Sequence, residues 1–485
     1  MIKQKKSIKV NFLYNVIYQI LAVCTPLITS PIISRNLGAE AVGIYSYTYS
    51  VAYYFLIFGM LGVKNYGSRS IAQCRDSKEQ LNYTFWSIYF FQLLSSILLV
   101  CCYVFYLLII CDADFKIALI QILLVFSATF DISWLFFGLE MFKTTTLRNA
   151  TVKIANVILI ILLIHEQNDL WKYTAIMAGG VLISQLIMWP FVPGLINFVK
   201  PKFVDILKHF KPNLILFIPV VATNIYKYMD KIMLGNISVM TELGYYENAE
   251  RLIQIPNSLV TALGTVMLPA MSKLIADKKN NEANELIAKS MIFSVFASSA
   301  LGFGIVSVAD VFVPFFFGDE FIPVISLLYI LAPIMVFISW GDVIRTQYLI
   351  PNMKDASYLF SVVAACIVNL ILNTLFIPRL GAQGAAVGTF FAEFLVCFLQ
   401  TLAVIGKLNI RSFLKDTIPF VAFGIVMFVV IRNITVYNNV VSVLFRMVIG
   451  ATIYLVLSAI YLWRKHSDIV YSVIPTKILK KMKRE

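Results

Sequence analysis

The charged residues inside apolar stretches are the best candidates for chemistry in this sequence. Six of them lie close together in the chain: Lys227, Asp230, Lys231, Glu247, Glu250 and Arg251. A charge at the centre of a bilayer costs about 2.5–3.5 kcal/mol on the insertion scale, so each should face a partner or a cavity. Residues four apart share a helix face, as Lys227 and Lys231 do. The set predicts either cations that line a site for an anionic ligand or an ion-pair cluster that joins two helices.

Isolated charges in other apolar stretches form a second set of candidates. Asp131, Asp310 and Glu393 are each interpreted as a proton or ion site, or as a hydrogen-bonded structural residue. Arg35 ends the first apolar stretch. We expect an anionic ligand to meet Arg35, Lys227, Lys231 and Arg251. We expect any ion coupling or gating to involve Asp131, Asp230, Glu247 and Glu393.

Residue patterns for catalysis or for cofactor binding are missing from the sequence. The three histidines lie far apart, and neither they nor the seven cysteines have metal-ligand spacing. No glycine-rich phosphate loop with its lysine is present, so ATP hydrolysis by this chain is not expected. We therefore expect a protein that is not an enzyme and that uses no cofactor and no metal.

Membrane-spanning helices must position the charged residues. Of the 485 residues, 60% are hydrophobic and 14% are charged, whereas a soluble domain is about 25% charged. The apolar residues come in stretches of about 20, long enough to cross a hydrocarbon core of about 30 Å as a helix. We expect an all-α polytopic membrane protein of about fourteen spans. The predicted spans are residues 12–34, 41–63, 83–111, 116–138, 149–165, 171–196, 213–235, 243–268, 290–317, 322–350, 356–378, 382–406, 417–433 and 440–463.

The distribution of Lys and Arg predicts how the chain is oriented. With the N-terminus inside the cell, roughly three quarters of the 40 Lys and Arg residues fall on the cytoplasmic side. Both termini should then be cytoplasmic, and the net charge of +14 reflects basic loops rather than a nucleic-acid partner. Lys227, Lys231 and Arg251 run against this trend, which favours a cationic lining over the ion-pair cluster.

An internal repeat divides the chain. Asn36-Leu37-Gly38 followed by Gly43-Ile44-Tyr45 matches Leu234-Gly235-Asn236 followed by Gly244-Tyr245-Tyr246. The offset corresponds to six helices, so the two halves should run parallel, which is one plan used by transporters. We expect a six-helix lobe at residues 1–200, a second at 201–410, and two extra helices with a basic cytoplasmic tail at 411–485.

Prolines occur at matching places in the two halves. Pro26 and Pro31 lie in the first span, and Pro219 lies in its counterpart. They predict either broken helices at a binding site or the ordinary kinks that are common in membrane helices.

Several short motifs together resemble the polysaccharide exporters of the multidrug/oligosaccharidyl-lipid/polysaccharide superfamily, specifically the O-antigen and capsule repeat-unit flippases. Each motif is weak alone, but their order and spacing are fairly specific, and they span most of the chain before the last two helices. The motifs are Arg35-Asn36-Leu37-Gly38, Gly43-Ile44-Tyr45, Tyr66-Gly67-Ser68-Arg69, Asp131-Ile132-Ser133-Trp134, Gly138-Leu139-Glu140, Asp230-Lys231-Ile232-Met233-Leu234-Gly235, Gly244-Tyr245-Tyr246, Ala249-Glu250-Arg251, Leu380-Gly381-Ala382 and Gly384-Ala385-Ala386.

This resemblance implies two six-helix lobes around a central cavity, as in the multidrug extruders. It implies that the cargo is an undecaprenyl-pyrophosphate-linked oligosaccharide, moved by alternating access across the bacterial cytoplasmic membrane for surface polysaccharide synthesis. By matched position, Arg35, Lys231 and Arg251 would meet the pyrophosphate. The implied partners are this lipid-linked sugar, membrane lipid, a polysaccharide polymerase and a chain-length regulator.

Three other functions stay open on the sequence alone. One is a cation-coupled multidrug extruder of the same fold, although drug cations would prefer a more acidic cavity than the Lys227–Arg251 region offers. A second is a flippase for a lipid-linked peptidoglycan precursor. A third is a scaffold without transport activity, which the charges within apolar spans argue against.

Overall fold

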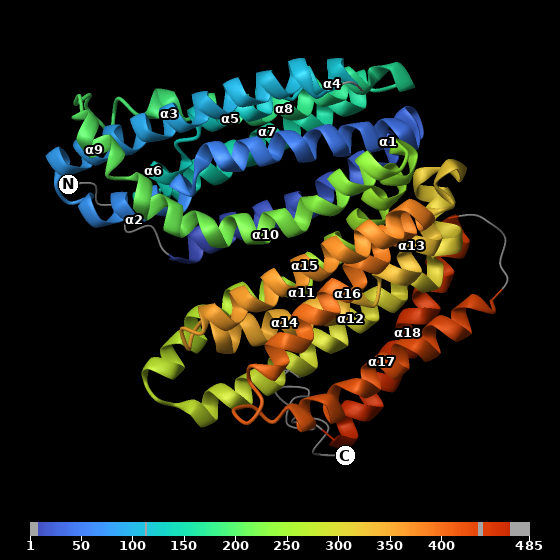
Figure 1. The fold of residues 1–485 in the computed structure, drawn as a ribbon. Coiled ribbons are helices and arrows are strands. Elements are labelled where there is room, and N and C mark those ends of the chain that lie inside the picture. The colour runs from blue at the N-terminus through green and yellow to red at the C-terminus, as the bar shows by residue number, and fades with distance from the viewer. Residues whose placement is uncertain (1–7, 112–113, 435–439, 466–485) are drawn as a thin grey trace. The chain divides into compact units, whose positions relative to one another are not determined.

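The computed structural model describes residues 8–111, 114–434 and 440–465. In these residues all the regular elements are helices, and no β-strand is formed (Figure 1). The lysines before residue 8 and most of the basic C-terminal tail lie outside the described residues.

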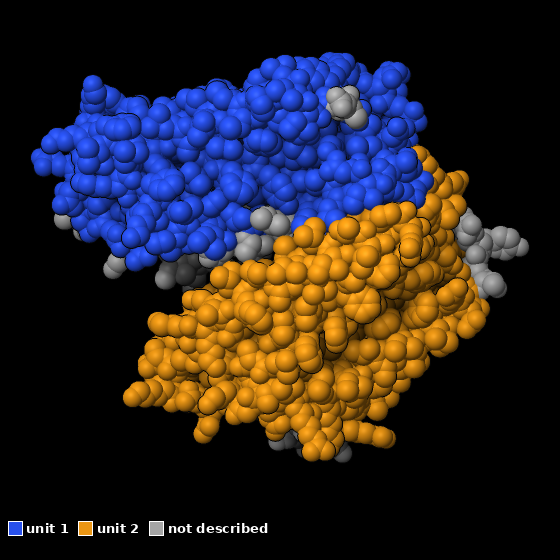
Figure 2. Space-filling view, in the orientation of Figure 1, with its two compact units in different colours: residues 1–247 blue, residues 248–485 orange. Residues whose placement is uncertain are grey.

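Two compact units make up the chain, residues 1–247 and 248–485 (Figure 2). The first contains α1 (Ile8–Met60), α2 (Val63–Cys74), α3 (Lys78–Ile109), α4 (Phe115–Ile120), α5 (Ile122–Phe130), α6 (Ser133–Gly138), α7 (Phe142–Leu163), α8 (Leu170–Leu186), α9 (Phe203–Leu207), α10 (Phe210–Ile237) and the start of α11 (Met240–Ala276). The second contains the rest of α11, α12 (Asn280–Phe317), α13 (Val324–Leu331), α14 (Ile334–Ile344), the π-helical segment η4 (Arg345–Leu349), α15 (Asp355–Leu380), α16 (Ala382–Leu402), α17 (Ile410–Arg432) and α18 (Val440–Lys465). The predicted division into lobes at residues 200 and 410 stays a prediction.

Eleven segments of the described chain are long and apolar enough to cross a membrane. They correspond to the predicted spans except the first, second and seventh, which fall on α1 and α10. The all-helical, multi-pass membrane architecture is therefore confirmed, whereas the count of fourteen and the placement of the termini stay predictions.

The first two predicted spans form one long helix, α1, with a single break. Its 53 residues run through Pro26 and Pro31 without leaving the helix, but Gly38 has φ 81° and ψ 174°. This backbone conformation is open to glycine and strained for residues with a Cβ atom. The break therefore lies at Gly38 rather than at the prolines, whose interpretation as ordinary kinks fits the structure.

Large apolar side chains cover the outside of the helices. Leu98, Phe105 and Leu108 on α3 are 62%, 61% and 73% exposed. In water such a surface would drive aggregation, but hydrocarbon solvates it without cost while the helical backbone satisfies its own hydrogen bonds. These outward faces are what a lipid-embedded helix requires.

A histidine joins the segment before α10 to two other helices of the first unit. The Tyr66 hydroxyl of α2 lies 2.8 Å from His209 Nδ1, and the Ser87 hydroxyl of α3 lies 2.9 Å from His209 Nε2. Burial of the imidazole lowers the pKa of His209 below its ordinary value of 6.5, although Asp205 nearby acts in the opposite direction. The neutral ring is therefore the form that this packing favours.

Candidate functional site

Two glycines allow α1 and the start of α11 to cross with their backbones in contact. A Cβ atom added at Gly43 would lie 1.8 Å from the Met240 carbonyl oxygen, and one added at Gly244 would lie 1.9 Å from the Ala39 carbonyl oxygen. The two contacts are reciprocal, since Gly43 matches Gly244 and Ala39 matches Met240 at the same offset in the internal repeat. Because no larger residue fits at either glycine, the repeat motif itself brings the two helices together.

A buried ion pair lies about one helical turn beyond this crossing. Lys231 Nζ on α10 is 2.7 Å from Glu247 Oε2 on α11, and the side chains are only 10% and 11% exposed. The Ser46 hydroxyl of α1 donates to the same carboxylate oxygen over 2.7 Å. Ser46 and Glu247 are 201 positions apart and thus occupy matching places in the repeat. If the two repeats were identical, an acid would stand at position 46 and would repel Glu247. The neutral Ser46 hydroxyl avoids this repulsion.

Tyrosine rings line the α1 and α10 surfaces beside the ion pair. Tyr45, Tyr49 and Tyr53 follow one another at four-residue spacing on α1, with ring centres 5.8 Å and 5.6 Å apart. Tyr228 of α10 lies 4.6 Å from the Tyr53 ring, and the Lys231 ammonium group lies 5.7 Å from the centre of the Tyr228 ring. The lysine is thus stabilised by a carboxylate and by an aromatic face.

A second acid is held close to the pair. The Tyr246 hydroxyl of α11 donates to Asp230 Oδ2 of α10 over 3.0 Å, and both residues are buried. We call Ser46, Tyr49, Tyr53, Tyr228, Asp230, Lys231, Tyr246 and Glu247 the Lys231 cluster. Its formal charge, one cation against two carboxylates, becomes neutral once Lys227 is included. An anionic ligand can therefore bind here only if a carboxylate gives up its partner, accepts a proton or is outweighed by further cations.

The structure places the predicted anion-binding residues on three helices, α1, α10 and α11. Lys231 is buried in the cluster, and Lys227 is exposed one turn earlier on α10. Arg35 is exposed on the first arm of α1, three residues before the break at Gly38. Arg251 is half-buried on α11, in the second compact unit. Sequence spacing placed Lys227 and Lys231 correctly on one helix, but the carboxylate partner of Lys231 comes from another.

Asp131 occupies a break in the fourth predicted span rather than the middle of a continuous helix. It ends α5 in an extended conformation, and its Oδ1 accepts a hydrogen bond of 2.9 Å from the Ser133 amide at the start of α6. Gln92 Nε2 of α3 donates to the Asp131 carbonyl oxygen over 2.9 Å. Trp134 Nε1 in turn donates to Gln92 Oε1 over 2.9 Å. These contacts fit the interpretation of Asp131 as a hydrogen-bonded structural residue.

Acidic residues of the second unit have different surroundings. Asp310 on α12 accepts two 2.9 Å hydrogen bonds from Arg446 of α18, which fits a structural role. The buried Asp342 on α14 forms an ion pair with the half-buried Arg345, the first residue of the π-helical segment, and sequence reasoning did not find this pair. Glu393 is half-buried on α16. In the described part of the chain, no group of three or more His, Cys, Asp or Glu side chains could hold a metal ion.

Sequence reasoning also missed the tyrosines and Ser46. The four-residue spacing of Tyr45, Tyr49 and Tyr53 is visible in the sequence and places the rings on one helix face. Aromatic residues are so common in this chain, at 14%, that the spacing alone did not stand out. Ser46 carries no signal of its own, because only its contact with Glu247 gives it a role.

Comparison with known proteins identifies the family. Residues 8–275, more than half of the chain, match the profile of the polysaccharide biosynthesis protein family. A protein of Escherichia coli strain K12 described as an "O-antigen transporter" is 23% identical over 405 residues, covering 82% of this chain and 97% of the relative.

Two solved structures share the fold. The Lipid II flippase MurJ, in an inward closed conformation, has a TM-score of 0.75 at 17% identity and covers 94% of this chain and 99% of its own. An inward-facing multidrug resistance MATE family transporter of the MOP superfamily has a TM-score of 0.62 at 14% identity, with 82% and 96% coverage. The chain therefore belongs to the polysaccharide biosynthesis protein family, as its motifs predicted, and it shares its fold with these two transporters.

Proposed function

We propose that this protein is a polysaccharide flippase that moves an undecaprenyl-pyrophosphate-linked oligosaccharide from the inner to the outer leaflet of the bacterial cytoplasmic membrane. It acts as a transporter by alternating access and catalyses no covalent step. The family and the O-antigen transporter of similar sequence support the cargo class. The observation in the structure that carries the proposal is the buried Lys231, held between Glu247 and the Tyr228 ring.

Lys231 can bind the pyrophosphate in exchange for its present partner. An ammonium group has three N–H donors, and a charge-assisted hydrogen bond to phosphate is comparable to one to carboxylate. When the cargo enters, Glu247 either turns away or takes up a proton, while Ser46 still donates to it. Cargo binding is thus linked to the ion pair that connects α10 to α11, which gives the bound cargo a means of changing helix packing.

The tyrosine array supplies a surface suited to sugar rings. The apolar face of a pyranose stacks against an aromatic ring, and Tyr49 and Tyr53 are partly exposed rings that follow the buried Tyr45 in a row along α1. Stacking on successive rings tolerates different sugars, whereas a dense set of directional hydrogen bonds would select one. A flippase for repeat units built from several sugars is served by such a surface.

Lys227, Arg35 and Arg251 are the further cations in this proposal. Lys227 lies one turn from Lys231 and is exposed, so it can meet a second phosphate oxygen without losing a buried partner. We assign Arg35 and Arg251 to later or earlier contacts along the path of the cargo. Arg251→Lys should keep part of the activity, because Lys retains the charge but lacks the bidentate fork of Arg.

The membrane potential can drive export. A pyrophosphate diester carries about two negative charges, and moving both outward across a potential of 100 mV, negative inside, releases about 4.6 kcal/mol. Coupling to an ion through Asp131, Asp230, Glu247 or Glu393 is the rival mechanism. If the membrane potential drives transport, Asp131 has a structural role only, because its side chain accepts a hydrogen bond from the Ser133 amide at the start of α6.

Purified protein in lipid vesicles tests the proposal. The vesicles carry a fluorescent undecaprenyl-pyrophosphate sugar, a drug cation or a peptidoglycan precursor lipid, and the potential and the proton and sodium gradients are set independently. We expect flipping of the sugar lipid only, accelerated by a potential of the correct sign. Transport of the drug cation alone, or of the peptidoglycan precursor alone, would replace the proposed cargo. Flipping driven only by an ion gradient, and lost in Asp131→Asn, would replace the proposed driving force.

A further inference from the structure

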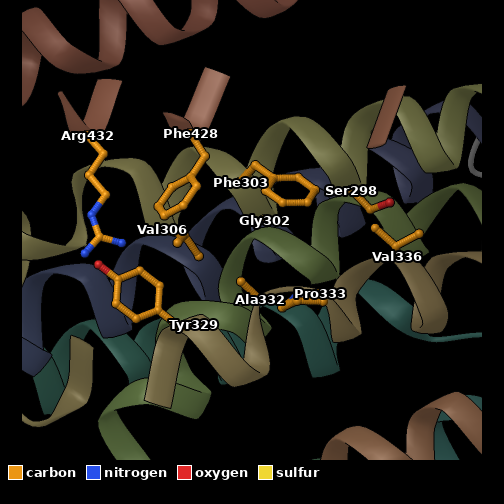
Figure 3. Close-up of a pocket in the computed structure, with 10 residues that line it drawn as sticks. All are labelled: Ser298, Gly302, Phe303, Val306, Tyr329, Ala332, Pro333, Val336, Phe428 and Arg432. Carbon is orange, nitrogen blue, oxygen red and sulfur yellow. The ribbon is translucent and has the colours of Figure 1, made fainter. Parts of the chain in front are cut away.

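An apolar pocket lies within the unit of residues 248–485, and none of its lining residues belongs to the Lys231 cluster. Its volume is about 310 Å³, roughly ten times the ~30 Å³ share of a water molecule in the liquid. Phe303 and Val306 of α12, Pro333 between α13 and α14, and Phe428 of α17 form its walls (Figure 3). A cavity of this size with apolar walls is suited to a hydrocarbon chain rather than to water or to a sugar.

One end of the pocket is cationic. The Arg432 guanidinium carbon lies 5.7 Å from the centre of the Tyr329 ring and 5.8 Å from that of the Phe428 ring. Figure 3 shows the guanidinium group and the Tyr329 hydroxyl turned toward one another at this end. Over the described residues, no carboxylate forms an ion pair with Arg432. Asp310, one helical turn beyond Val306, is already bound by Arg446.

The position of Arg432 matches the depth of a lipid headgroup. It is the last residue of α17, whose 23 residues are long enough to cross the hydrocarbon core. An arginine at the end of a spanning helix keeps its charged group at the membrane interface while its aliphatic part covers apolar surface. The pocket therefore runs from the interface into the hydrocarbon layer, with a cation at the outer mouth and apolar walls within.

From these features we propose that the pocket is a binding site for an anionic glycerophospholipid of the bilayer, with one acyl chain between α12, α13 and α17 and the phosphate at Arg432. A phospholipid fits better than the long prenyl chain of the cargo, because the volume holds only a short length of hydrocarbon. Phospholipids also far outnumber any carrier lipid in the membrane, so mass action favours them. The bound lipid fills space between three helices and holds α17 against the rest of its unit.

Native mass spectrometry of the purified full-length protein tests this site. The probes are phosphatidylglycerol, diacylglycerol without a phosphate, glycerol phosphate without chains, and undecaprenyl phosphate. We expect phosphatidylglycerol to bind best, because only it combines the anionic group with acyl chains. Stronger binding of undecaprenyl phosphate at this site would overturn the proposal and assign the pocket to the cargo's tail. Equal binding of diacylglycerol would show that Arg432 recognises no phosphate.

Paired variants locate the binding. Arg432→Gln should weaken phosphatidylglycerol binding about fivefold, the contribution of one basic residue near an anionic headgroup. Arg432→Lys should largely restore it. Arg411→Gln, which removes an exposed cation from the other end of the same helix, is the matched control and should bind normally. Equal losses in Arg432→Gln and Arg411→Gln would refute a specific site.

A second variant tests the apolar part of the pocket independently of charge. Val306→Phe places a ring in the space that the acyl chain would occupy, and it should lower the number of bound phosphatidylglycerol molecules by one. Thermal unfolding in detergent shows whether the variant is folded, and added phosphatidylglycerol should raise the unfolding temperature of the wild type but not of Val306→Phe. Unchanged lipid binding by folded Val306→Phe would overturn the proposal. These readouts need no flipping activity, so the site stands or falls separately from the proposed function.

Discussion

Removing the charges of Lys231 and Glu247 one at a time and then together separates their contribution to stability from their contribution to transport. Both side chains are about nine-tenths buried, and their charged atoms are 2.7 Å apart. In Lys231→Met the Glu247 carboxylate stays buried and loses its ion pair with Lys231, while its hydrogen bond from Ser46 remains. Breaking a buried pair in this way costs about 3–5 kcal/mol, and we expect the lower end because the Ser46 hydrogen bond remains.

The double variant Lys231→Met/Glu247→Gln should recover most of this loss. No uncompensated charge is left, and the neutral amide introduced at position 247 still accepts the hydrogen bond from Ser46. Replacing a whole buried pair by neutral groups is often without net cost. We therefore expect the double variant to be at least about 2 kcal/mol more stable than Lys231→Met.

Transport should follow a different order from stability. If Lys231 binds the pyrophosphate, the stable double variant exports no cargo, just as Lys231→Met exports none. Stability is measured by thermal unfolding in detergent, and transport is measured by the amount of polysaccharide on the cell surface and by flipping in vesicles. Normal export by the double variant would refute the binding role of Lys231 and leave only a structural pair. Unchanged stability of Lys231→Met would refute the buried ion pair itself.

Three further predictions follow from the described contacts. Gly244→Ala should destabilise the protein by about 1–3 kcal/mol, because its Cβ atom would overlap the Ala39 carbonyl oxygen. Gly179→Ala is the control and should not destabilise it, because no atom lies within 4 Å of a Cβ added there. Equal unfolding temperatures of the two variants would contradict the crossing of α1 and α11. Because burial lowers the pKa of His209 from its ordinary value of 6.5, the contribution of its neutral ring to stability is complete above pH 6.5. This contribution is lost as the pH falls from 6.5 through the lowered pKa. His209→Gln should therefore lose less stability than the wild type between pH 7.5 and 5.5, conditions set around that value, and an identical loss in both proteins would refute this. Asp131→Asn keeps an oxygen for the Ser133 amide and should fold and transport in the potential-driven assay, whereas Asp131→Ala should be less stable by about 1 kcal/mol; equal stability would remove the capping role.

Hydrophobic stretches alone predicted most of the fold. A helix of about 20 apolar residues has one stable place in a membrane, because its backbone is satisfied internally and its side chains are solvated by lipid. The predicted spans therefore coincide with helices along the chain, from α3 to α18. The repeated glycines likewise mark a close contact between two helices, since Gly43 and Gly244 each lie against a main-chain oxygen of the other helix.

Helix breaks were harder to locate from the sequence. Pro26 and Pro31 were the visible signals, yet the chain breaks at Gly38 and at Asp131. A proline in a membrane helix loses one hydrogen bond, which neighbouring groups can replace, so it need not end the helix. A break at Asp131 depends on Gln92 from another helix to satisfy the freed carbonyl oxygen, and that partner lies 39 positions away.

The sequence by itself determined the membrane class, the family and the identity of the charged residues that must have partners. Only the tertiary structure decided which partner the distant charges received: Glu247 for Lys231, and Arg446 for Asp310. The physical reason is that the two kinds of interaction join residues at different separations along the chain. Burial of apolar surface and backbone hydrogen bonding act along a helix and leave a periodic pattern, whereas an ion pair forms over a few ångströms between helices that only the folded chain brings together.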